Sequence, residues 1–173
     1  MKKLLRIFVL LVMSFSLSGC SQQLKSSKIE DYDKYLAKVE YAKDYMPSVE
    51  NCGEYSSVLA TYKYTGFLFE TYTVGLFLSY DQEEYQKQRE EIALEYVFFT
   101  PDDETLVSDC DAAANGYNIR LVKQEYMLTT EKMGLLIGFD DAKQKICYLY
   151  YYDFDLDVLD NLDGYVRQYF EMA

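Results

Sequence analysis

The amino-acid sequence predicts an α+β fold in which helices pack on an antiparallel sheet of about five strands. Three segments repeat their apolar residues at helical spacing, and others are rich in β-branched and aromatic residues, as strands are. The expected order of elements is α-β-β-α-β-β-β-α. Because strands and helices do not alternate one by one, this order favours an antiparallel sheet over a parallel one.

Three helices are predicted. The first spans 30–45 and ends before Pro47, which cannot continue a helix. The second spans 82–97 and follows Asp81, whose side chain is expected to cap the first turn. Its buried stripe is predicted from Tyr85, Ile92, Tyr96 and Val97. The third lies within 156–170, where leucine and aromatic residues recur at helical intervals.

The predicted strands span 55–65, 74–80, 117–124, 133–139 and 145–153, with a less regular segment at 67–71. The last two strands form a hairpin. Both faces of 145–153 are mostly apolar, which is typical of a central strand. Thr100–Asn118 is the longest stretch without periodicity, and we treat this polar connection as a candidate functional loop.

The chain opens with a basic segment and an apolar run. Lys2, Lys3 and Arg6 precede the run at 7–17, and small residues follow it. The run is too short for a membrane-spanning helix, which needs about 20 apolar residues. The pattern is typical of a secretory signal peptide. The alternative interpretation is a hydrophobic first helix of the domain.

Leu17-Ser18-Gly19-Cys20 resembles the lipobox of bacterial lipoproteins, in which leucine and two small residues precede a cysteine. The resemblance implies that a diacylglycerol is attached to the Cys20 sulfur and that Cys20 becomes the first residue of the mature chain. Two acyl chains anchor a protein stably in a membrane. The expected organisation is a signal peptide over 1–19, a lipidated polar tether over 20–28 and one globular domain over 29–173, at the extracytoplasmic face of the cell membrane.

Removal of the leader leaves a strongly acidic chain. Three basic residues leave and no acidic residue does, so the formal net charge changes from −12 to −15. Such a surface repels nucleic acid and anionic lipid headgroups, so we expect no nucleic-acid partner and assign the membrane contact to the lipid on Cys20. Histidine is absent, which excludes Ser-His-Asp and Cys-His catalysis and His-ligated zinc.

Three further cysteines follow Cys20. Cys52 and Cys110 lie in predicted loops and could form a disulfide outside the cytoplasm. Because three is an odd number, at least one of the three thiols has no partner within the chain. Cys147 lies inside a predicted strand and is interpreted as a small core residue. No C-x-x-C motif occurs, so a thioredoxin-like redox site has no support.

Aspartates crowd the segment that follows the last predicted strand. Asp153, Asp155 and Asp157 match the first three ligand positions of a calcium-binding EF-hand loop. Val158 and Gly164 stand where that loop needs a glycine and a bidentate glutamate. The favoured interpretation is therefore that the strand ends here and that Asp157 or a neighbour caps the last helix, with a noncanonical calcium loop as the alternative. We expect no cofactor.

Two longer stretches, YMPSVENCGEY and IGFDDAKQKICYLYYYDFDLD, resemble uncharacterised small lipoproteins of low-GC Gram-positive bacteria, which carry no known activity. The expected lipid anchor, the acidic surface and the lack of a catalytic motif favour a non-catalytic binding or interaction module. Its partner would be an extracytoplasmic protein or glycan. The alternative is a carboxylate-based hydrolase of cell-envelope or dietary glycans, because two of the 29 acidic residues could face each other across a cleft.

Overall fold

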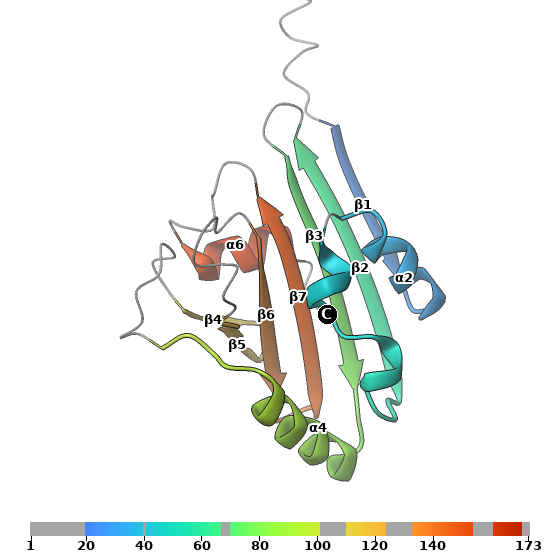
Figure 1. Ribbon diagram of the computed structural model, residues 1–173, viewed down its shortest axis with the longest axis vertical. Coiled ribbons are helices and arrows are strands. Elements are labelled where there is room, and N and C mark those ends of the chain that lie inside the picture. Colours follow the sequence, from blue (N-terminus) through green and yellow to red (C-terminus); the bar gives the residue numbers. More distant parts are fainter. Residues whose placement is uncertain are drawn as a thin grey trace, which may run out of the picture.

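The computed structural model describes residues 20–39, 41–66, 70–100, 110–123, 133–153 and 161–170. Within them, one antiparallel sheet of seven strands carries four α-helices, so the predicted α+β class is confirmed with two more strands than expected. The strands lie side by side in the order β1-β2-β3-β7-β6-β5-β4 (Figure 1). Their bounds are β1 Cys20–Ser26, β2 Ser57–Gly66, β3 Thr71–Ser79, β4 Asp111–Ala114, β5 Tyr117–Leu121, β6 Met133–Asp140 and β7 Lys145–Asp153.

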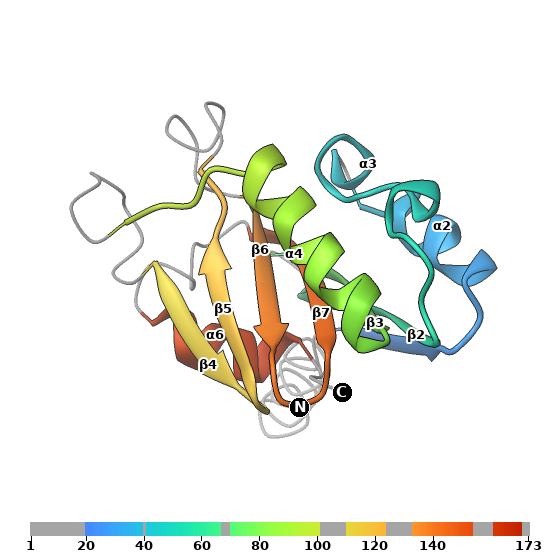
Figure 2. The same cartoon turned by 90° about the horizontal axis from the view of Figure 1, so that it is seen from below.

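Helices lie on both faces of the sheet. α2 (Glu30–Leu36), α3 (Ala42–Tyr45) and α4 (Gln82–Glu95) lie against one face, which we call the front face (Figure 1). α6 (Leu162–Tyr169) lies against the opposite, back face, as the view from below shows (Figure 2). A short 3-10 helix, η1 (Val49–Asn51), precedes β2. Of the described helices, none is both long and apolar enough to cross a membrane.

β7 is a central strand, as predicted, and it contributes to two separate cores. Tyr148 and Tyr150 point into the front core. Cys147, Leu149 and Tyr151 point into the back core. All five side chains are almost completely buried. Since the sheet separates the two cores, a side chain in one cannot reach a side chain in the other.

The predicted helix at 30–45 is in fact two short helices, α2 and α3. Tyr41, just before α3, has a left-handed backbone with φ of 60°, a conformation that interrupts a helix. Tyr32 of α2 and Ala42 of α3 are both fully buried, and the Tyr32 hydroxyl donates to the Pro47 carbonyl at 2.9 Å. The apolar spacing correctly predicted that these residues are buried, but the prediction of one unbroken helix was wrong.

α4 begins where the sequence predicts and ends earlier. The Asp81 carboxylate accepts a hydrogen bond from the Glu84 backbone N–H at 2.9 Å, which confirms the predicted cap. Tyr85 and Ile92 are buried and Tyr96 is half-buried. The helix ends at Glu95, and Val97 is 65% exposed. The assignment of Val97 to the buried stripe was wrong because the chain has left the helix before that residue.

β1 and β4, the two edge strands, are not predicted by the sequence analysis. β1 occupies most of 20–28, which we expected to be a tether, and its first residue, Cys20, pairs with Gly66 of β2. Residues 20–26 therefore form part of the sheet. β4 lies inside Thr100–Asn118, the predicted polar connection.

The remaining strands agree with the predictions within three residues at each end. The hairpin of β6 and β7 is confirmed. Residues 67–69 and 154–160 fall outside the described part of the chain. The irregular segment at 67–71 is therefore tested only from Glu70 onward, where Thr71 opens β3, and the last predicted helix only from Asn161 onward, where α6 follows.

Candidate functional site

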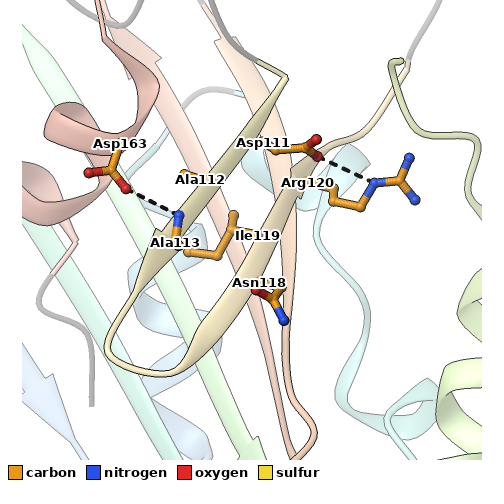
Figure 3. A pocket seen from close by; sticks show the side chains of 7 residues that line it. All are labelled: Asp111, Ala112, Ala113, Asn118, Ile119, Arg120 and Asp163. Carbon is orange, nitrogen blue, oxygen red and sulfur yellow. Dashed lines mark hydrogen bonds and ion pairs between the residues drawn. The ribbon is translucent and has the colours of Figure 1, made fainter. Parts of the chain in front are cut away.

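A groove of about 530 Å³ opens on the β4–β5 hairpin beside α6 (Figure 3). Its lining combines small or apolar side chains with charged and amide groups: Ala112, Ala113, Ile119, Asp111, Asn118, Arg120 and Asp163. Six of these residues come from the hairpin, and Asp163 reaches it from α6. The groove therefore depends on two parts of the chain that are far apart in the sequence.

The hairpin is built on a two-residue turn, Asn115-Gly116. Both residues have positive φ, 50° and 93°, as the tightest hairpin turns require. A side chain at Gly116 would also be crowded, because a Cβ there would lie 2.9 Å from Oδ2 of the buried Asp140. Asparagine followed by glycine is a strong sequence signal for a hairpin, and it would have revealed β4.

α6 covers the free edge of β4 with two side chains. The Asp163 carboxylate accepts a hydrogen bond from the Ala113 backbone N–H at 3.1 Å. The Arg167 guanidinium donates to the Ala113 carbonyl. Asp163 and Arg167 also pair with each other, with Nε 2.8 Å from Oδ2. Together they form hydrogen bonds with both the N–H and the carbonyl of Ala113, as a neighbouring strand would. We call these three residues the edge clamp.

The charges of the edge clamp stabilise one another. Hydrogen bonding from Arg167, and then from the Ala113 N–H, holds the pKa of Asp163 below its usual value. The same carboxylate raises the pKa of Arg167. Asp163 is therefore ionised at neutral pH.

Arg120 is held in place by three contacts beside the groove. Its Nε lies 3.5 Å from Oδ1 of Asp111, the residue opposite it on β4. Its guanidinium stacks over the Phe98 ring at 4.6 Å from the centroid. One of its terminal nitrogens donates to the Phe99 carbonyl at 3.5 Å. Because the Arg120 side chain is still 44% exposed, it can also contact a partner.

The candidate calcium ligands are only partly within the described structure. Asp153 ends β7 and is fully buried. Burial, followed by the charge of Asp153, raises the pKa of Tyr165 on α6. Asp155 and Asp157 lie outside the described residues, and among the described ones no group of three acidic or cysteine side chains could hold a metal ion. The calcium loop stays a prediction.

α6 is capped at its first turn by Asn161. The Asn161 side chain accepts a hydrogen bond from the Gly164 N–H at 2.8 Å. The sequence analysis considered Asp157 or a neighbour for this role, and Asp157 lies outside the described residues.

The possible disulfide between Cys52 and Cys110 is not formed. Cys52 lies in the front core and Cys110 in the back core, so the sheet separates their sulfur atoms. Burial raises the pKa of Cys52 to about 12. Cys147 is fully buried in the back core, as predicted for a small core residue. Cys20 opens β1, and its lipidation stays a prediction.

Comparison of the chain with protein-family models, with curated proteins and with solved structures finds no match.

Proposed function

We propose that the protein is a membrane-anchored, extracytoplasmic binding module. A lipid on Cys20 would hold the domain at the membrane, and the groove on the β4–β5 hairpin would receive an extracytoplasmic protein or glycan. The proposal rests most directly on the charged groups of the groove, Asp111, Arg120 and Asp163, which are held in position by contacts within the domain. Groups that are already ordered lose little freedom when a partner binds.

The groove and the proposed anchor lie at opposite edges of the sheet. β1 begins with Cys20 at one edge, and β4 is the other edge strand. With about 4.8 Å between neighbouring strands, six spacings place β4 about 29 Å from β1 across the sheet. This distance supports simultaneous anchoring and partner binding, because a partner at β4 would not compete with the attachment of β1.

The charges of the groove favour binding over the alternative of a glycan hydrolase. A carboxylate-based hydrolase needs one carboxyl group that keeps its proton near neutral pH, and such a group has a raised pKa. The pKa of Asp163 is instead lowered by Arg167. The other carboxylate of the groove, Asp111, lies beside Arg120. Asp163 is thus ionised rather than poised to donate a proton, and Asp111 is placed to form an ion pair.

Site-specific crosslinking would test the groove as the binding site. A photoreactive amino acid replaces Asn118, which is exposed in the groove, in the full chain expressed in a bacterial envelope. The matched control carries the same group at Glu90, which is exposed on α4. We expect a discrete crosslinked partner from Asn118 that is absent from Glu90 and is reduced by Arg120→Gln. Identical products from both positions would contradict the proposal.

The hydrolase alternative has its own assay. The purified protein is incubated with cell-envelope glycans, and the release of reducing ends is measured. We expect no cleavage. Cleavage that is lost in both Asp111→Asn and Asp163→Asn would establish the alternative.

The anchor is tested separately with labelled fatty acid. We expect label on the native chain and none after Cys20→Ser. Label that persists on the Cys20→Ser chain would show that the lipobox assignment is wrong.

A further inference from the structure

A row of three tyrosines crosses the front face at the end of the sheet where Cys20 lies. Tyr64 of β2 pairs with Tyr72 of β3, which pairs with Tyr152 of β7. Cys20 pairs with Gly66, two residues beyond Tyr64 on β2. We call Tyr64, Tyr72 and Tyr152 the tyrosine row. All three residues are half-buried, so each is partly exposed to solvent.

The tyrosine row differs from the next row along the same strands. There, Tyr62 and Tyr150 are buried, and each is covered by a tyrosine from a helix, with centroid distances of 6.1 Å to Tyr35 of α2 and 5.8 Å to Tyr45 of α3. The upper ends of β2 and β3 extend beyond these helices (Figure 1). The helices thus cover one row of tyrosines and stop short of the other.

The tyrosine row is internally ordered. The ring centroids of Tyr64 and Tyr72 are 4.9 Å apart, and those of Tyr72 and Tyr152 are 6.3 Å apart. The Glu70 carboxylate accepts hydrogen bonds from the hydroxyls of Tyr64, at 3.1 Å, and Tyr72, at 3.0 Å. These contacts fix the rings in place while part of each remains exposed.

We infer that the tyrosine row lies against the headgroup region of the membrane that the lipid on Cys20 enters. Tyrosine combines an apolar ring with a polar hydroxyl and is enriched where hydrocarbon meets water. This inference rests on the proposed lipid anchor and adds an orientation to it, with the Cys20 end of the sheet on the bilayer.

A membrane fits the tyrosine row better than a glycan does. Sugars stack on flat aromatic surfaces, whereas the planes of neighbouring rings here are inclined by 39° and 63°. A bilayer interface accepts tilted rings because it has no fixed shape of its own. The net charge of −15 after leader removal repels anionic lipids, so the contact is expected with neutral phosphatidylcholine.

The absence of tryptophan from the chain allows a direct test. Tyr152→Trp places a single reporter in the tyrosine row and leaves both hydroxyls that bind Glu70. The matched control, Ala142→Trp, lies in the exposed β6–β7 turn beyond the other end of β7. Seven steps of about 3.3 Å along β7 separate Tyr152 from Lys145, so the control lies at least about 23 Å away.

Both lipidated variants are reconstituted in phosphatidylcholine vesicles with and without brominated acyl chains. We expect the Tyr152→Trp emission to shift to shorter wavelength and to be quenched by the brominated lipid, and the Ala142→Trp emission to be unaffected. Equal quenching of both reporters, or of neither, overturns the inference. An emission shift caused by soluble cell-wall glycans but not by vesicles also overturns it.

Mass spectrometry of the mature chain separates the two possible failures. Acyl chains on Cys20 together with an unquenched Tyr152→Trp reporter overturn the inference alone. A mature chain without acyl chains overturns the anchor and the inference together. If Tyr152→Trp does not fold, as judged by circular dichroism, Tyr64→Trp is the second reporter, with the same expected quenching.

Discussion

Replacing Gly116 with alanine tests the turn that builds the groove. Gly116 has φ of 93°, and a residue with a Cβ loses about 1–2 kcal/mol in such a left-handed conformation. The new methyl group would also lie 2.9 Å from Oδ2 of Asp140. Asp140 is 2% exposed and accepts a hydrogen bond from the Lys143 N–H at 3.1 Å. Its carboxylate cannot move away without loss of that bond.

The two effects add to a large fraction of the stability of a typical domain. The crowding adds about 1 kcal/mol to the backbone strain, so we expect Gly116→Ala to lower the free energy of unfolding by about 2–3 kcal/mol. Domains are typically stable by about 5–15 kcal/mol. For a domain of this size the midpoint of thermal unfolding should fall by about 4–12 °C.

Thermal and urea unfolding would measure this loss, and hydrogen exchange of the β5 amides would show whether the hairpin opens locally. Asn115→Gly is the matched control in the same turn. Its φ of 50° suits glycine, so we expect a change within about 0.5 kcal/mol. A Gly116→Ala protein that unfolds like the native chain, or an equal loss in Asn115→Gly, would refute the described turn.

Three further predictions concern the cap of α6, alkaline pH and acid pH. Asn161→Ala removes the N-cap and should destabilise the protein by about 1 kcal/mol in urea unfolding, whereas Asn161→Asp, which can also cap, should not. Burial raises the pKa values of Cys52 and Tyr96 to about 12, so above about pH 9 these groups lose protons in the unfolded chain before they do in the folded one. Stability should therefore fall between about pH 9 and 12, and a flat profile in that window would contradict the burial of both groups. Because the pKa of Asp163 is lowered, its ion pair with Arg167 should persist as pH falls through the usual aspartate range and break only below that range. An NMR titration of the Asp163 carboxyl carbon would measure the midpoint. A midpoint at the usual aspartate value would contradict the ion pair.

The sequence predicts those parts of the fold in which local pattern and burial agree. β6, β7 and the start of α4 were predicted because the apolar and aromatic runs of the strands and the cap at Asp81 are local signals. The break before α3 was not predicted, because Tyr41 is a residue type that seldom adopts a left-handed backbone. The buried residues keep their helical spacing in the sequence across this break, so apolar periodicity alone cannot reveal the break.

The edge strands were missed for a different reason. β1 is mostly exposed and contains a single large apolar residue, Leu24, so it lacks the alternation of a half-buried strand. β4 is four residues long, and three of them are alanine, which has low strand propensity. Only the Asn115-Gly116 pair signalled that a hairpin lies there.

The groove itself could be anticipated only in part. The turn of its hairpin has a sequence signal, but the edge clamp joins Ala113 to α6 across about 50 residues. Asp163 belongs to the aspartate-rich stretch that follows β7, and nothing in that stretch marks it as the partner of a backbone amide. No local pattern contains that contact, because it arises from the packing of α6 against the back face.

The position of Cys20 at the start of a paired strand has a mechanical consequence. β1 lies along β2 over its full length of seven residues. Under the proposed lipid attachment, a pull from the membrane acts along β1 and strains its hydrogen bonds with β2 together, in shear, rather than opening them one after another. A flexible tether would stretch and let the domain swing. A strand joined to the sheet from its first residue would instead transmit the pull directly to the domain, so that the anchor acts as a stiff joint.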